Sequence, residues 1–217
     1  MSDPKQKSRL SGTVRHRLML VVDDFKQTEK KTLEKAITFA EEAHQKQFLR
    51  PTKEKPEKGE PYIVHPMRVA LILLEEVEIK DVIAVASALL HDVIEAKRET
   101  ISVSDIEREF GRPIAMLVSI LTKPPMPPYI EERQRKSRGW LCITSELSKP
   151  RSWFVSLNWL TVDSLRSAPD WANRAEKETY LAETRDFYIP LAEKSDDYLH
   201  EELLAACEQL ELDLKFN

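Results

Sequence analysis

Residues 81–96 read DVIAVASALLHDVIEA and indicate the fold class of this 217-residue chain. Apolar side chains occupy nearly every side of the helix that this stretch predicts, and a helix that is apolar all round is normally buried at the centre of its domain. His91 and Asp92 interrupt the apolar run near its end. The stretch therefore predicts a central, buried helix that carries two adjacent ionisable groups.

The sequence on both sides of this stretch also follows helical patterns. Apolar residues recur every three or four positions from residue 32 to residue 44. Further helices are expected from about Pro66 and from about Pro113 to Thr122, and Ser104 and Glu107 have the spacing of a capping box. With four glycines and 32% charged residues, the composition suits an all-α protein better than a β-sandwich or barrel.

Length and composition favour a single domain. The chain is 41% apolar and long enough to bury a sizeable core. We expect a loose N-terminal arm over residues 1–27 and one domain of about eight helices over residues 28–217. Within this domain, residues 140–162 are atypical, because they hold three of the four tryptophans and follow no 3.6-residue period.

The His91-Asp92 pair is the first candidate for chemistry. Ionisable groups in so apolar a helix need partners, because a buried polar group without one is costly. Imidazole and carboxylate suit Mn, Fe or Zn, whereas the simpler interpretation is a hydrogen-bonded pair at a helix end. His65, just before Pro66, is a second candidate ligand at a helix start, and an ordinary N-terminal histidine is its alternative. Neither feature alone decides between the interpretations.

Together, these two features resemble a known family. The strings AEEAHQKQ, GEPYIVHPMRVALIL, ASALLHDVIEA and ETISVSDIEREFGRPIAMLVSILTK follow one another within residues 32–123. They are similar to the hydrolase half of the Rel/SpoT stringent-response enzymes and of their small single-domain relatives. The similarity resumes at ETRDFYIPLAEK, residues 183–194. These motifs are long, ordered and specific.

The resemblance implies an HD-type helical fold that binds one divalent metal ion, typically manganese. It also implies removal of the 3′-pyrophosphate from guanosine tetraphosphate (ppGpp). His65, His91 and Asp92 match three metal ligands of the family, and Glu95 matches the acid that orients or deprotonates the attacking water. Such an ion would neutralise pyrophosphate charge and acidify that water. The alternative for Glu95 is a solvated carboxylate.

The basic loop of residues 46–58 is a candidate for gripping the phosphates of such a substrate. A cluster of cations in a protein of net charge −4 favours a local anion site, and a solvated linker is the equal alternative. Arg50 lies near a family arginine, and we predict Arg50 and Lys53 as substrate-binding residues. The net charge gives no global case for binding to nucleic acid or to a membrane.

Two departures from the family bear on activity. Ala96 stands where the family has the second acid of its catalytic Glu-Asp pair. The family's Lys-Leu-Ala-Asp-Arg segment, whose Asp is the fourth protein ligand, is missing near residues 157–162, where this chain reads LNWLTV. Asp163 is the nearest acid and Ser164 lies near the position of a nucleotide-contacting Asn. We therefore predict Asp163 as a metal ligand and Ser164 as a substrate-binding residue.

The genetic code offers one explanation for the missing segment. Codons compatible with residues 153–162, read two bases later, give Val-Arg-x-x-Lys-Leu-Ala-Asp-Arg, which is the missing motif at its expected place. We hypothesise that residues 140–162 are an out-of-frame segment that packs poorly and supplies no metal ligand. Ordinary divergence, or a substituted lid with a role of its own, is the alternative.

The remaining expectations concern partners and location. Cys142 and Cys207 lack a metal-type spacing, and two thiols fit a reducing cytosol better than a disulfide framework. No apolar run approaches the ~20 residues needed to span a bilayer, and the polar start lacks an apolar signal core. We expect a cytoplasmic protein whose partner is a small nucleotide, ppGpp or a related compound, and not nucleic acid or a membrane.

The sequence thus predicts an all-α HD-type metal phosphohydrolase that resembles ppGpp 3′-pyrophosphohydrolases, with an activity that is weakened or lost. A non-catalytic HD-fold protein that binds nucleotide or a regulatory partner is the alternative from a different class. A third interpretation is hydrolysis of another phosphorylated nucleotide at the same site.

Overall fold

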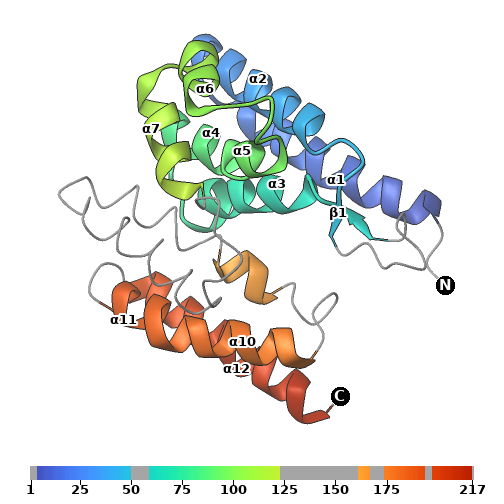
Figure 1. Ribbon diagram of the computed structural model, residues 1–217, viewed down its shortest axis with the longest axis vertical. Coiled ribbons are helices and arrows are strands. Elements are labelled where there is room, and N and C mark those ends of the chain that lie inside the picture. Colours follow the sequence, from blue (N-terminus) through green and yellow to red (C-terminus); the bar gives the residue numbers. More distant parts are fainter. Residues whose placement is uncertain (1–3, 50–58, 123–160, 167–173, 194–196, 217) are drawn as a thin grey trace.

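The computed structural model describes residues 4–49, 59–122, 161–166, 174–193 and 197–216, and it confirms an all-α fold (Figure 1). Within these residues, a small antiparallel sheet of two two-residue strands accompanies the helices, and it pairs Phe48 with Pro61 and Leu49 with Glu60. The elements, in chain order, are α1 (Pro4–Val22), α2 (Gln27–Ala43), β1 (Phe48–Leu49), β2 (Glu60–Pro61), α3 (Val64–Leu71), the π-helical turn η1 (Ile72–Glu76), α4 (Val82–Leu90), α5 (Val93–Ala96), α6 (Val103–Phe110), α7 (Arg112–Leu121), α10 (Arg174–Glu183), η2 (Thr184–Tyr188), α11 (Ile189–Ala192) and α12 (Asp197–Phe216). Residues 161–166 form a further short helix.

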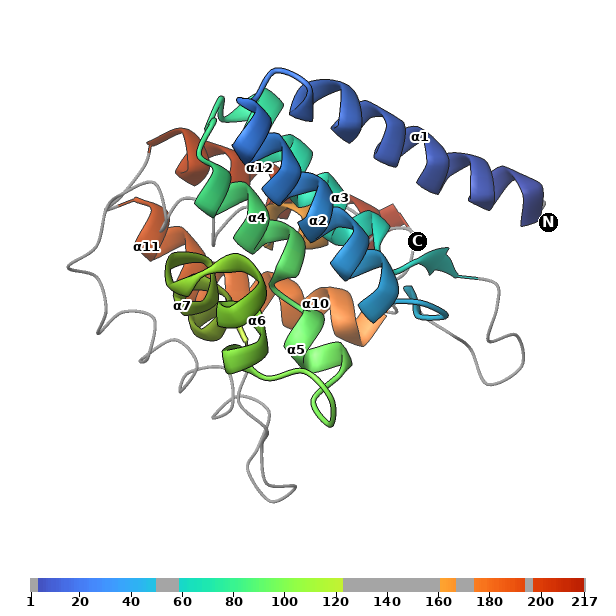
Figure 2. The same ribbon diagram turned by 90° about the horizontal axis from the view of Figure 1, so that it is seen from above.

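Helix α4 is the expected central helix. Every residue from Ala84 to Leu90 is buried, and α2, α3 and α7 pack around the helix; Figure 2 shows α2 beside it. The Asp81 side chain begins the helix by accepting hydrogen bonds from the backbone N–H groups of Ile83 and Ala84, which satisfies two of its unpaired donors.

The predicted single helix over residues 81–96 is in fact two. It stops at Leu90 and resumes as α5 at Val93, so that His91 and Asp92 lie in the break between the two helices. The His91 ring bonds the Ala88 carbonyl through Nδ1 at 2.8 Å. Side-chain bonds of this kind compete with the backbone ladder of a helix. The break turns both ionisable side chains toward one point.

Residues 4–22 form helix α1 where we expected a loose arm, and that expectation is corrected. Leu18 and Val22 are fully buried, and Val14 packs partly against the same core. The spacing of four between these residues places them on one face of the helix. The basic stretch of residues 15–17, between Val14 and Leu18, concealed this stripe in the sequence. Helix α1 contacts α3 and α2, so it belongs to the folded unit.

The capping box lies two residues before its predicted position. Ser102, and not Ser104, caps α6: its hydroxyl accepts from the backbone N–H of Asp105, whose carboxylate accepts from the N–H of Ser102. Both spacings satisfy the motif, but the observed register directs the fully buried Ile106 into the core. Gly111, with φ of 85°, ends the helix, in a backbone conformation that glycine adopts without strain.

A second core joins the two halves of the chain. Figure 1 shows α10, α11 and α12 apart from helices α1–α7, with residues 161–166 between them. Val162 and Leu165 of this short helix are 0% and 1% exposed. They belong to one buried cluster with Val69 of α3 and with Leu199 and Leu203 of α12. This cluster seats the short helix against the N-terminal half.

Several expectations fall outside the described residues. Those for residues 140–160, including poor packing, stay untested, as do those for Arg50, Lys53 and Cys142. Of the atypical segment, only Thr161 and Val162 are described, and both are buried. No helix in the described ranges is long and apolar enough to cross a membrane.

Candidate metal centre

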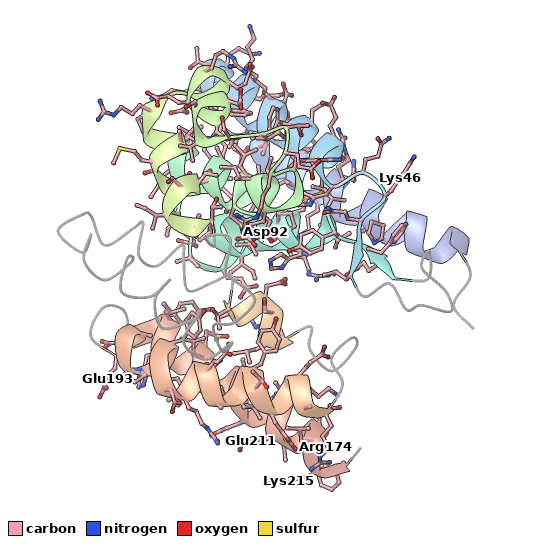
Figure 3. The ribbon with its side chains drawn as sticks, in the orientation of Figure 1. Lys46, Asp92, Arg174, Glu193, Glu211 and Lys215 are labelled. Atoms are coloured by element: carbon pink, nitrogen blue, oxygen red, sulfur yellow. The ribbon has the colours of Figure 1, made fainter. Side chains whose placement is uncertain are left out.

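His65, His91 and Asp92 converge at the start of α3 and the break between α4 and α5. One potential ligand atom from each residue lies within 4.8 Å of the others, and all three residues are buried. Figure 3 shows Asp92 on the side of the N-terminal half that faces the short helix of residues 161–166. The prediction that these three side chains meet is therefore confirmed.

Both histidine rings are oriented by a bond at Nδ1. The Nδ1 of His91 lies 2.8 Å from the Ala88 carbonyl oxygen, and the Nδ1 of His65 lies 2.7 Å from Oδ2 of Asp163. A neutral imidazole that donates Nδ1–H to an oxygen keeps its lone pair at Nε2. The Nε2 of His91 is 2.8 Å from Oδ2 of Asp92. Each ring therefore has its Nε2 to offer to a shared cation.

Asp92 is held by a neighbour that the sequence reasoning did not select. The Tyr62 hydroxyl donates a hydrogen bond to Oδ2 of Asp92. Burial, followed by the charge of Asp92, raises the pKa of Tyr62, so the hydroxyl stays protonated and remains a donor. Tyr62 belongs to the GEPYIVHP string, but no spacing rule distinguished it from an ordinary core tyrosine.

His44 lies behind Tyr62 and was likewise missed. The two rings are 4.8 Å apart between centroids, and the Nδ1 of His44 lies 2.7 Å from the Gln47 side-chain oxygen. Burial lowers the pKa of His44. Its Nε2 is enclosed and has no hydrogen-bond partner among the described residues. This histidine supports the tyrosine that contacts Asp92.

Asp163 lies at the edge of the cluster and is 4% exposed. Its Oδ2 contacts His65, and its Oδ1 accepts from Nε of Arg68 at 2.9 Å. Burial would raise the pKa of Asp163, but the bond to His65 and the Arg68 guanidinium outweigh it and hold the pKa below its usual value. The carboxylate is therefore ionised. Its role as a direct metal ligand stays a prediction.

The other sequence candidates take less central places. Glu95 and Ala96 lie in α5, one turn beyond His91, and both are partly exposed. The charge of Glu95 contributes to the raised pKa of Tyr62, which places the Glu95 carboxylate in the neighbourhood of the cluster. Ser164 is half-buried, next to Asp163 in the short helix. The expected contact of Ser164 with a nucleotide stays a prediction.

The donor set of the cluster fits a divalent transition-metal ion. Two imidazole nitrogens and one carboxylate oxygen suit Mn, Fe or Zn. Two donors bonded to one ion at about 2.1 Å are at most about 4 Å apart, and the mutual limit of 4.8 Å is close to that span. The bonds at both Nδ1 atoms supply the outer partners that metal-binding histidines normally have.

Comparison with known proteins supports an HD-type fold. A family model described as HD domain matches residues 36–140, a range that includes His65, His91 and Asp92. A solved structure of a metazoan orthologue of SpoT, which hydrolyses ppGpp and plays a role in starvation responses, is similar in fold, with a TM-score of 0.64 and 22% identity over 82% of this chain and 94% of that one. The chain is thus similar to HD-domain proteins in sequence and in fold.

Proteins of similar sequence have more specific names. The chain is 34% identical over 164 residues to the guanosine-3′,5′-bis(diphosphate) 3′-pyrophosphohydrolase of Aquifex aeolicus, covering 75% of this chain and 21% of the relative. It is 38% identical over 107 residues to the enzyme of that name, MESH1, from Danio rerio, covering 49% of this chain and 56% of the relative. The chain thus spans about half of the animal relative and about a fifth of the bacterial one.

Proposed function

We propose that this chain is a metal-dependent 3′-pyrophosphohydrolase of ppGpp, with His65, His91 and Asp92 as the protein ligands of the ion. The orientation of the two histidines carries the proposal. Each is tied at Nδ1 to an oxygen acceptor, and the ligand atoms of the three residues lie within 4.8 Å of one another. A bond at Nδ1 leaves Nε2 as the ring nitrogen that can bind a cation, and Nε2 of His91 lies 2.8 Å from Oδ2 of Asp92.

In this proposal, the residues around His65, His91 and Asp92 have different roles in hydrolysis. When bound, a divalent ion would neutralise pyrophosphate charge and make the attacking water more acidic. Glu95 accepts the proton of that water, as a general base positioned one turn after His91. Tyr62 holds the Asp92 carboxylate through its hydroxyl, and its neutral state adds no negative charge beside an anionic substrate. Arg50, Lys53 and Ser164 contact the nucleotide in this proposal.

The proposed activity is slow because of Ala96. A general acid–base group typically contributes about 10²–10⁴-fold to a rate, and this alanine supplies no carboxylate beside Glu95. The same observation favours the second candidate function, a non-catalytic HD-fold protein that binds a nucleotide. Manganese as the ion and the cytoplasm as the location belong to the first proposal. They are supported by the resemblance and by the two cysteines, respectively.

Turnover of ppGpp in Mn²⁺ by purified protein tests the proposal. We expect the wild type to release pyrophosphate slowly. His91→Ala should release none, and neither Mg²⁺ nor an excess of the variant protein should restore the release. A panel of other phosphorylated nucleotides distinguishes hydrolysis of ppGpp from that of a related compound. Tight binding of ppGpp without any release of pyrophosphate would support the non-catalytic candidate instead.

A further inference from the structure

Arg68 connects the metal cluster to the short helix of residues 161–166. It lies one turn after His65 in α3, so both side chains project from the same face of the helix. Its Nε donates to Oδ1 of Asp163 at 2.9 Å, and its Nη1 donates to Glu60 at 2.8 Å. Asp163 uses its second oxygen for His65, at 2.7 Å. The Arg68 guanidinium thus orients the Asp163 carboxylate, and this carboxylate in turn orients His65, a proposed metal ligand.

The geometry of Asp163 leaves little room for other orientations. Val162 and Leu165 anchor the short helix in the second core, and Arg166 at its end is paired with Glu76 and Glu202. The Asp163 carboxylate is 6% exposed, so its two oxygens meet His65 and Arg68 within a packed environment. Arg68 compensates this buried charge at hydrogen-bonding distance.

We propose that Arg68 is a positioning residue of the metal centre, which acts by holding Asp163 against the Nδ1 of His65. Glu60 fixes the far side of the guanidinium and so completes a chain of four side chains, Glu60–Arg68–Asp163–His65. Asp163 serves in this chain as the outer partner of a ligand and not as a ligand itself. The inference rests on the proposed function only in assuming that His65 binds the ion.

The proposal requires an arginine and not merely a positive charge. A planar guanidinium donates from Nε and Nη1 to two carboxylates in a fixed geometry, whereas an ammonium group is a flexible point charge. Lysine at this position retains the charge beside Asp163 but not the two directed bonds. Arg68→Lys is therefore expected to fall between the wild type and Arg68→Met.

The test measures the binding of Mn²⁺ and the tautomer of His65. Calorimetric titration with Mn²⁺ is carried out on the wild type, Arg68→Met, Arg68→Lys and Asp163→Asn. Arg166→Met is the matched control, because it removes another arginine of the same region, one that pairs with the carboxylates of Glu76 and Glu202 at the end of the short helix. Circular dichroism at each protein's working temperature ensures that only folded variants are compared.

We expect Arg68→Met and Asp163→Asn to bind Mn²⁺ about 10–100-fold more weakly, which is the usual effect of losing an outer partner. Arg166→Met should stay within about threefold of the wild type, because its pairs are partly exposed. Unchanged affinity in Arg68→Met, or an equal loss in Arg166→Met, overturns the proposal. Complete loss of binding in Asp163→Asn beside normal binding in Arg68→Met overturns it too, since Asp163 would then be a ligand.

The ring tautomer of His65 gives an answer without metal or substrate. Long-range ¹H–¹⁵N spectra of the metal-free wild type should show the proton at Nδ1, and Arg68→Met should show both tautomers. A single Nδ1 tautomer in both proteins contradicts the proposal. Because this measurement needs no turnover, a wild type that fails to hydrolyse ppGpp refutes the proposed function and leaves the result for Arg68 intact.

Discussion

Leu165→Ala is the substitution that best tests whether the short helix of residues 161–166 is a packed part of this protein. Leu165 is 1% exposed and lies in the cluster that joins α3 to α12. Truncation of a buried leucine costs about 2–5 kcal/mol, the higher values applying where the surroundings cannot collapse. For a protein of 150–250 residues, each kcal/mol lowers Tm by about 2–4 °C. The expected fall in Tm is therefore about 4–20 °C.

The assay is thermal unfolding followed by circular dichroism at 222 nm, with Leu204→Ala as the matched control. Leu204 lies in α12 and is 40% exposed, so its truncation should change stability by less than about 0.5 kcal/mol. Asp163 precedes Leu165 by two residues, and we expect Leu165→Ala also to weaken Mn²⁺ binding. If the Tm values of the two variants agree within error, the packing of the short helix, and with it the placement of Asp163, is wrong.

Three further predictions concern the site and the helix caps. Ala96→Asp should raise kcat for ppGpp by about 10²–10⁴-fold, because it adds a carboxylate beside Glu95; an unchanged kcat in a folded variant would argue for the non-catalytic candidate. Removal of metal by a chelator should lower Tm, since an ion at 100 times its Kd stabilises the folded state by about 2.7 kcal/mol, and His91→Ala should abolish that difference. The Ser102 hydroxyl and backbone N–H lower the pKa of Asp105 to about 2. Because the pKa of Asp105 is lower in the folded state than in the unfolded state, this cap stabilises the folded state fully above the unfolded pKa of about 3.9. The stabilisation is lost as pH falls through about 2. Carboxyl NMR titration checks this, and the pKa of Asp105 should rise in Ser102→Ala.

The prediction that His65, His91 and Asp92 converge succeeded because the strings that carry them resemble a known family, whereas each local pattern alone left a simpler interpretation open. An apolar helix that contains His91 and Asp92 leaves those groups little access to water, and they must meet a partner within the fold. His65 stands before Pro66, at a helix start, and only the resemblance selected it over an ordinary N-terminal histidine. The distance between His65 and the other two residues could not be read from the sequence, since His65 lies 26 positions before His91, with the rest of α3 and all of α4 between them.

The predictions of the α6 capping residue and of the N-terminal arm were wrong for the same reason. Ser102 and Ser104 both offer the spacing of a capping box, and the choice between them depends on whether Ile106 reaches the core. Helix α1 appeared to be a loose arm because its apolar stripe is narrow and flanked by charge. In both cases the local pattern permits two outcomes, and burial against distant residues selects one.

By itself, the sequence determined the all-α class and the buried central helix, because helical periodicity acts over short stretches of chain. The resemblance of its strings to a known family selected His65, His91 and Asp92. Only the tertiary structure decided the roles of Tyr62 and Arg68. Both were ordinary residues within longer strings, and their contacts to Asp92 and Asp163 span 30 and 95 positions. Such contacts form when separate helices pack together, so no pattern along the chain could specify them.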